Sequence, residues 1–118
     1  MRKTTNPDYL NGVPELLVLE LVGRRAMHGY ELVRAIERTS DHTFQFGEGC
    51  IYPILHRLGA QGHLASRRET VDGRSRVVYR LTTSGRKRLS SRVAAWRNIA
   101  TAIDRILQGE SDGEPAVS

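Results

Sequence analysis

The side chains in this sequence that can do chemistry are mostly hydrogen-bond donors. Tyr52, His56 and Arg57 lie close together in the stretch that begins at Gly49. A phenol, an imidazole and a guanidinium at helical spacing can donate to phosphate oxygens or to the edges of bases. The four histidines lack the spacing of zinc ligands. No catalytic triad, carboxylate pair or phosphate-binding glycine loop is evident. We therefore expect no enzyme, no metal site and no cofactor.

Basic residues gather in a second stretch. Nine of the 18 Lys and Arg residues lie between positions 66 and 92, against only Glu69 and Asp72. Three of the 13 acidic residues lie in the last nine positions, which leaves 18 basic against 10 acidic residues before them. Guanidinium groups fit phosphate oxygens, and each neutralised phosphate releases a counterion. The distribution favours a polyanionic partner, nucleic acid before a membrane, although a basic surface that serves only solubility gives the same total.

The composition also predicts where the protein resides. A single cysteine cannot form an intrachain disulfide, which suits a reducing compartment. The first twelve residues lack the apolar stretch of a signal peptide. The longest apolar run, Leu16–Val22, is short and contains Glu20. We expect a cytoplasmic protein, associated with the nucleoid when bound to DNA, with no membrane span.

Three short helices must position the candidate donors, and we expect them at residues 14–23, 29–39 and 49–61. Pro14 suits the first turn of a helix, where its missing N–H costs nothing. Gly62 is typical of a residue that closes a helix. The third helix has an apolar stripe for the core, formed by Ile51, Ile54, Leu55 and Leu58.

A hairpin is expected after the third helix, with strands at residues 64–71 and 76–82. The four residues between them begin with Asp72-Gly73, a strong hairpin signal. Val77, Tyr79 and Leu81 alternate to one face, whereas Arg76, Val78 and Arg80 alternate to the other. Thr82 or Thr83 can cap the helix that follows.

The last helix, expected at residues 83–108, has an apolar seam with a period of 3.5 residues. Such a seam is typical of a helix that pairs with another helix, so we predict dimerisation. The alternative is that the seam packs back on its own domain. We assign the acidic tail, residues 109–118, to disorder. The predicted dimerisation residues are Leu89, Val93, Trp96, Ile99, Ala100, Ile103 and Leu107.

The order helix, helix, helix, hairpin predicts an α+β, mainly helical fold: a winged helix-turn-helix DNA-binding domain at residues 13–82, after a flexible arm at 1–12. In such folds the third helix enters the major groove and the hairpin lies along the backbone. For Tyr52 the alternative is packing under the hairpin. For Arg57 it is an ion pair with an acid of the second helix. The predicted DNA-binding residues are Tyr52, Pro53, His56, Arg57, Arg67, Arg74 and Arg76.

Several motifs, in order and at the expected spacing, resemble the PadR family of transcriptional regulators over residues 13–107. They are His28–Leu32, Ile51–Leu58, Gly62–Leu64, Gly73–Arg76 and Tyr79–Gly85. Two positions depart from the family: Cys50 replaces a small hydroxyl residue, and Gly59 often corresponds to Glu.

The short C-terminal part is similar to the family's small subgroup, which has a single dimerisation helix. The resemblance implies a homodimeric repressor on a pseudo-palindromic operator, released by a small molecule. It also implies that a flat aromatic effector binds between paired Trp96 side chains, with Ala100 nearby. The alternative for Trp96 is to fill the dimer interface.

Two other functions remain open. The hairpin of a winged helix can bind an acidic protein instead of DNA, which would make the chain an interaction module. Cys50 lies where a helix N-terminus can activate a thiol, so oxidation or alkylation there would switch DNA binding. The alternative for a lone cysteine is a small hydrophobic residue of the core.

Overall fold

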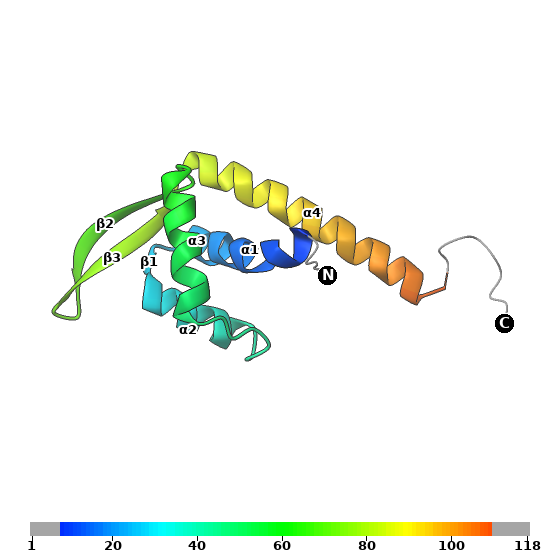
Figure 1. The fold of residues 1–118 in the computed structure, drawn as a ribbon, viewed down its shortest axis with the longest axis horizontal. Coiled ribbons are helices and arrows are strands. Elements are labelled where there is room, and N and C mark those ends of the chain that lie inside the picture. The colour runs from blue at the N-terminus through cyan, green and yellow to red at the C-terminus, as the bar shows by residue number, and fades with distance from the viewer. Residues whose placement is uncertain (1–7, 110–118) are drawn as a thin grey trace, which may run out of the picture.

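The computed structural model describes residues 8–109, in which a small helical body carries a hairpin at one end and a long helix at the other (Figure 1). The chain is elongated, with extents of 64 × 31 × 28 Å. The elements are α1 (Asp8–Arg24), β1 (Met27–His28), α2 (Gly29–Thr39), α3 (Glu48–Ala60), β2 (Leu64–Val71), β3 (Arg74–Leu81) and α4 (Thr83–Leu107). This is the predicted α+β arrangement of a winged helix-turn-helix with a C-terminal helix. The seven residues at the start of the predicted arm, and nearly all of the predicted tail, lie outside the described residues.

The core lies where α1, α2 and α3 meet. Leu19 of α1 and Ile51, Leu55 and Leu58 of α3 are completely buried, and Leu32 of α2 is 1% exposed. The predicted stripe of α3 therefore faces the core, because residues three and four apart share one side of a helix. This packing turns the opposite side of α3 toward solvent.

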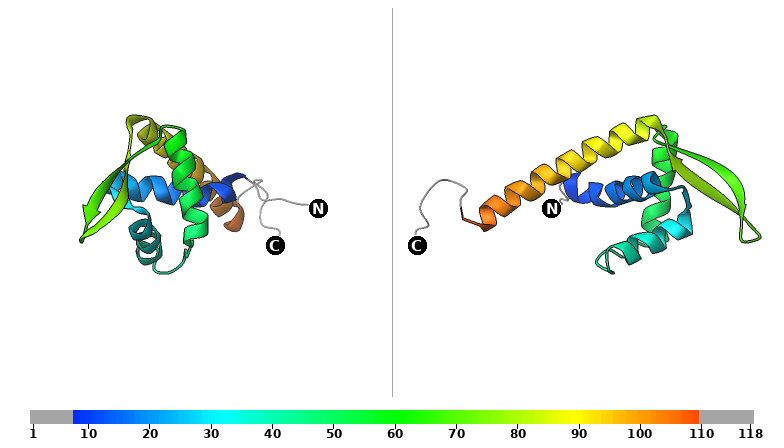
Figure 2. Two further views of the ribbon diagram at one scale, coloured as in Figure 1. Left: turned by 60° about the vertical axis from the view of Figure 1, so that its left-hand side comes forward. Right: turned by 180° about the vertical axis from the view of Figure 1, so that it is seen from behind.

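The hairpin differs from the prediction in its turn. β3 begins at Arg74, two residues early, because Asp72 and Gly73 close the hairpin alone with φ values of 53° and 79°. Positive φ at both central residues defines a type I′ turn, whose twist matches that of the strands. The hairpin projects from the body as the wing, here defined as β2, the turn and β3 (Figures 1 and 2).

β1 was not predicted, because two residues are too short to produce a periodic signal. It pairs with β3, which makes β3 the central strand of an antiparallel sheet in the order β1-β3-β2. The predicted alternation along β3 is consequently incomplete. Val78 and Tyr79 are adjacent in sequence, and both are buried.

The helix ends follow known capping rules. Gly62, with a φ of 82°, follows α3 and lets the N–H of His63 donate to the carbonyl of Leu58 at 2.9 Å, as predicted for a closing glycine. The hydroxyl of Thr82 accepts a hydrogen bond from the N–H of Gly85 and donates to the carbonyl of Gly62 at 2.7 Å. Thr82 thus joins the start of α4 to the end of α3.

The predicted start of α1 is wrong, because the helix begins at Asp8 and Pro14 is its seventh residue. An internal proline removes one backbone hydrogen bond and usually disturbs a helix. Here the burial of Glu15, Val18 and Leu19 directly after the proline holds the helix against the core. The first turns of α1 thereby extend along α4.

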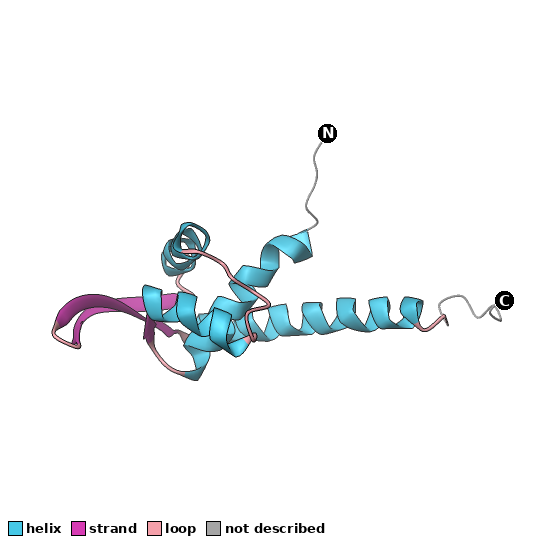
Figure 3. Ribbon diagram, turned by 90° about the horizontal axis from the view of Figure 1, so that it is seen from below, coloured by secondary structure: helices cyan, strands magenta, loops and turns pink. Residues whose placement is uncertain are grey.

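α4 has two different halves. Its first half packs against α1, and Leu89 contacts the core of the same chain. Leu89 thus follows the alternative of packing back on its own domain, and its assignment to the dimer seam stays a prediction. Residues 101–109 are all exposed, and this end of α4 projects beyond α1 (Figure 3).

Candidate nucleic-acid interface

A polar hollow of about 290 Å³ lies between the outer side of α3, the start of α2 and the wing. We call it the wing hollow. It brings together side chains that the sequence placed in separate motifs. Its lining residues are His28, Gly29, Tyr52, His56, Arg68, Ser75, Arg76, Val77 and Tyr79.

Tyr52 is half-buried at the base of the wing hollow, and the structure explains its position. A Cβ at Gly29 would overlap its ring, so only glycine at the start of α2 leaves room for this tyrosine. Tyr52 also lies beside Tyr79, whose pKa is raised by burial and by the proximity of Tyr52. Tyr52 is thus both packed under the wing, as the alternative had it, and part of an open polar surface.

His56 and Pro53 are exposed on the outer side of α3, as expected. The ring of His56 lies 6.4 Å from that of Tyr52, centroid to centroid. Among residues 8–109, neither ring nitrogen of His56 has a hydrogen bond of the kind that holds His28 and His63. The side of α3 that faces the wing hollow therefore offers a phenol and an imidazole at one level.

His28 is a functional candidate that the sequence analysis missed. Its Nδ1 accepts a hydrogen bond from the N–H of Glu31 at 3.3 Å, so His28 is the N-cap of α2. Because Nδ1 is the acceptor, the neutral ring has its proton on Nε2, which can act as a donor. Histidine is not among the usual N-cap residues, so the sequence carried no clear signal for this role.

The arginines of the wing divide into two sets by their place on the sheet. Glu69 binds Arg67 at 2.8 Å and Arg80 at 3.2 Å, which occupies the predicted DNA-binding residue Arg67 on one face. Arg68, one residue on, points to the other face and lines the wing hollow. Arg68 was not predicted as a contact. The signal that could have identified it is its cross-strand pairing with Val77.

Arg74 and Arg76 lie at the tip and on the stem of the wing. Arg74 is exposed at the start of β3, whereas Arg76 is half-buried and lines the wing hollow. Both residues lie on the hairpin, and their contact with DNA stays a prediction. By strand register Arg76 lies opposite Glu69, on the sheet face that carries Arg67 and Arg80.

Arg57 is turned away from the wing hollow. Its Nη1 lies 3.1 Å from Oε1 of Glu15, a carboxylate of α1. The alternative of an ion pair was correct in kind, but the acid belongs to the first helix and not to the second. Arg57 is still 44% exposed along its side chain, so its other nitrogens reach solvent.

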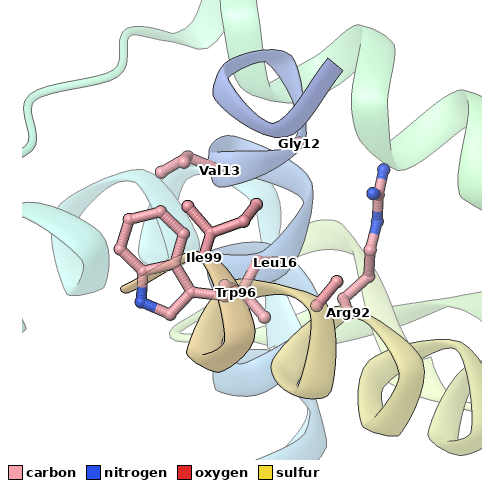
Figure 4. A pocket seen from close by; sticks show the side chains of 7 residues that line it. Gly12, Val13, Leu16, Arg92, Trp96 and Ile99 are labelled. Carbon is pink, nitrogen blue, oxygen red and sulfur yellow. The ribbon is translucent and has the colours of Figure 1, made fainter. Parts of the chain in front are cut away.

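Trp96 lies over a small cavity of about 30 Å³ between the start of α1 and the middle of α4. Figure 4 shows the indole beside Val13 and Ile99, with Arg92 on the other side of the cavity. Trp96 is 41% exposed, so much of its ring is on the surface. Ala100 is not among the lining residues. This cavity is too small for an aromatic ligand.

Two further residues are placed by the structure. Cys50 is half-buried in the first turn of α3 and packs against the core, which agrees with the role of a small hydrophobic residue. The thiol switch stays a prediction. Within residues 8–109, no group of three or more metal-ligating side chains comes together, and no helix is long and apolar enough to cross a bilayer.

Comparison with known proteins places the chain in a family. The model of the transcriptional regulator PadR-like family matches residues 18–91. The transcriptional regulator Rv3488 of Mycobacterium tuberculosis is 34% identical over 81% of this chain and 87% of its own length.

Two solved structures have the same fold. The Smu.1704 protein of Streptococcus mutans has a TM-score of 0.75 and 30% identity, over 84% of this chain and 90% of that one. A PadR-like regulator of Bacillus cereus has a TM-score of 0.75 and 27% identity, over 88% of this chain and all of its own. The chain therefore belongs to the PadR-like family of transcriptional regulators.

Proposed function

We propose that the protein is a sequence-specific DNA-binding repressor that acts as a homodimer. The observation that carries the proposal is the wing hollow, where donors of α3 and arginines of the wing face the same space. Tyr52, His56 and Arg68 offer neutral and cationic donors within that space, and Arg76 belongs to its lining. This set suits a phosphate strand that runs beside a helix in the major groove.

The free end of α4 supports a homodimer. Three apolar side chains are strongly exposed there: Ile103 is 46%, Ile106 is 65% and Leu107 is 76% exposed. Trp96 and Ala100 continue the same side of the helix toward the body. A helix with an uncovered apolar seam is stabilised by a second copy, and a two-fold dimer presents the same patch from both partners.

A dimer gives the two copies of α3 a fixed separation. Two recognition helices about 34 Å apart, or one turn of DNA, fit successive major grooves of a pseudo-palindromic operator. The wings then contact the backbone outside each groove. This arrangement would require a DNA site with two-fold symmetry.

Control by a small aromatic effector is part of the proposal. In a dimer, the Trp96 surfaces of the two protomers and Ala100 on the same side would border one larger space next to the single-chain cavity of about 30 Å³. An aromatic ring can stack between two indoles. A ligand releases DNA only if it favours a dimer geometry that does not fit the operator.

The competing proposal is an interaction module that binds an acidic protein through the wing. The exposed arginines of the wing serve either partner. Tyr52 and His56 favour DNA, because a wing that binds protein alone does not need donors on the outer side of α3.

Selection of fragments from a random DNA pool at near-physiological salt separates the two proposals. Salt suppresses sequence-independent binding, so enrichment reports recognition of bases. We expect a two-fold-symmetric site to be enriched. A folded dimer that enriches no sequence would contradict the proposal and favour the interaction module.

A further inference from the structure

Glu15 is the one charged side chain of the described residues that is buried in the core. Only 2% of its side chain is exposed, and Val18 and Leu19 of the same helix are completely buried. A carboxylate in such surroundings needs partners, because an unpaired buried charge is strongly unfavourable.

The partners of Glu15 are three arginines from two helices. From α4, Arg88 donates from Nε at 2.7 Å and Arg92 donates from Nε at 3.2 Å. From α3, Arg57 donates from Nη1 at 3.1 Å. We call these four residues the Glu15 cluster. Glu15 is the only carboxylate of the described residues that joins α3 to α4.

The Glu15 cluster stays ionised. Burial raises the pKa of Glu15, but the hydrogen bonds from Arg88, Arg92 and Arg57 outweigh burial and lower it to about 2. The charge on the carboxylate is therefore constant at any pH that a cell experiences. The cluster acts as a fixed joint and not as a pH switch.

The two helices held by this joint have different tasks. Arg57 directly follows His56, which faces the wing hollow. The ion pair that holds Arg57 therefore also holds the orientation of α3. Arg88 and Arg92 lie in the packed half of α4, and the apolar seam lies in the other half. Both helices pack on α1, which carries Glu15 between them.

The part of α4 beyond the Glu15 cluster is long enough that a small tilt displaces its end by several ångströms. From Arg92 to Leu107 the helix rises about 22 Å. A tilt of about 10° at the cluster moves the far end by about 4 Å, comparable with the 3.4 Å rise of one base pair. Because both protomers of a two-fold dimer tilt together, the spacing of the two recognition helices changes by up to about 8 Å, or about two base-pair steps.

We propose that Glu15 is a positioning residue for DNA recognition, because its carboxylate fixes α4 relative to α3 and thereby sets the half-site spacing that the dimer accepts. This inference rests on the homodimer and the operator of the proposed function. It adds the residue that determines which spacing is preferred.

The test measures affinity for a set of DNA sites that differ only in half-site spacing. The sites carry the selected operator halves at the selected spacing and at spacings one base pair shorter and longer. The variants are Glu15→Gln and Arg57→Gln. The matched control is Glu20→Gln, since Glu20 is also on α1 and has one exposed partner, Arg24, at 3.0 Å.

We expect the wild type and Glu20→Gln to prefer the selected spacing by about tenfold or more. Glu15→Gln and Arg57→Gln should remain dimeric and bind the three spacings within about threefold of one another. A role in stability alone, or a direct contact of Arg57 with DNA, predicts instead an equal loss at all three spacings. That result would overturn the inference.

The inference can be tested even if one of the variants fails to fold. Arg57 is half-exposed, so Arg57→Gln leaves Glu15 with two partners and should fold even if Glu15→Gln does not. If the wild type selects a two-fold site and Arg57→Gln keeps the preference for its spacing, the positioning role fails while the proposed function stands. If the wild type selects no such site, the proposed function fails first.

Discussion

The two ends of the molecule contrast in their chemistry. At one end the wing hollow is polar and cationic, with Tyr52, Arg68 and Arg76 around a space of about 290 Å³. At the other end α4 exposes the apolar side chains of Ile103, Ile106 and Leu107. The polar, cationic end suits an anionic partner, whereas the apolar end suits another apolar surface.

The difference shows how binding and assembly are separated in a small chain. An apolar surface is covered most favourably by another apolar surface, whereas arginines and hydroxyls retain their hydration until an anion replaces the water. The Glu15 cluster lies between the ends and shares no residue with the lining of the wing hollow. Substitutions can therefore impair one end and leave the other intact.

Charge on the apolar end should have the largest effect. Ile103→Glu combined with Ile106→Glu places two carboxylates in the proposed seam, and the dimer dissociation constant should rise by at least about 100-fold. Analytical ultracentrifugation measures the change. Asn98→Glu with Thr101→Glu adds the same charge to the opposite side of α4 and should leave the dimer intact. If the variant with Ile103→Glu and Ile106→Glu stays dimeric, the free end of α4 is not the dimer interface.

Acid should weaken the joint between the ends. The pKa of Glu15 is about 2 in the folded protein and 4.5 for an ordinary glutamate. A lowered pKa stabilises the fold above pH 4.5, and this stabilisation is lost as pH falls from 4.5 toward 2. Its size is about 3 kcal/mol.

Urea unfolding of the wild type and of Glu15→Gln between pH 7 and pH 3 measures this contribution. The difference in stability between the two proteins should shrink as pH falls. A constant difference over the whole range would contradict the ionised cluster.

Crowding the polar end should displace Tyr52. In Gly29→Ala, the new Cβ overlaps the ring of Tyr52, which must move. We expect a loss of about 1–3 kcal/mol in stability and about tenfold in affinity for DNA. Gly59→Ala is the control, because its Cβ meets nothing within 4 Å and alanine favours the helix. If Gly29→Ala binds DNA as the wild type does, Tyr52 is not a contact.

The smallest effect should come from the wing and should separate its two faces. Arg68→Ala removes a cation from the wing hollow, so we expect a uniform loss of affinity across DNA sequences. The slope of log affinity against log salt should fall by about one. Arg67→Ala removes a residue already bound to Glu69 and should change the slope less. Equal slopes for Arg68→Ala and Arg67→Ala would contradict the assignment of different roles to the two faces of the wing.

Local features of the fold could be predicted from the sequence, because each depends on a short pattern. The limits of α2 and the closing role of Gly62 follow from periodicity and from the special backbone of glycine. The cap by Thr82 and the turn at Asp72-Gly73 are also local. β3 begins two residues earlier than expected because the same pattern allows a shorter turn.

Features that depend on contacts distant in sequence could not be predicted. Glu15 and Arg92 are 77 residues apart, and nothing near Glu15 indicates burial of its charge. The ion pair between Arg57 and Glu15, which are 42 residues apart, could not be predicted for the same reason. Leu89 fits the heptad pattern of the seam, but only the packing of α4 on α1 shows that it serves the core.

The same limit applies to the candidate site. Tyr52 and His56 were predicted from one motif, and both line the wing hollow. Arg68 and His28 were missed, since their place there depends on the register of the sheet and on the cap of α2. Strand register is set by the whole sheet, so alternation along one strand does not identify which arginine faces α3.

The central claim is that two copies of the chain read the two halves of one DNA site. Its most direct test is the affinity for the selected operator compared with the same fragment in which one half is scrambled. We predict a loss of about 100-fold or more on scrambling, because half of the base contacts disappear while the dimer is unchanged. Equal affinity for the two fragments would mean that one protomer suffices, and it would contradict the account.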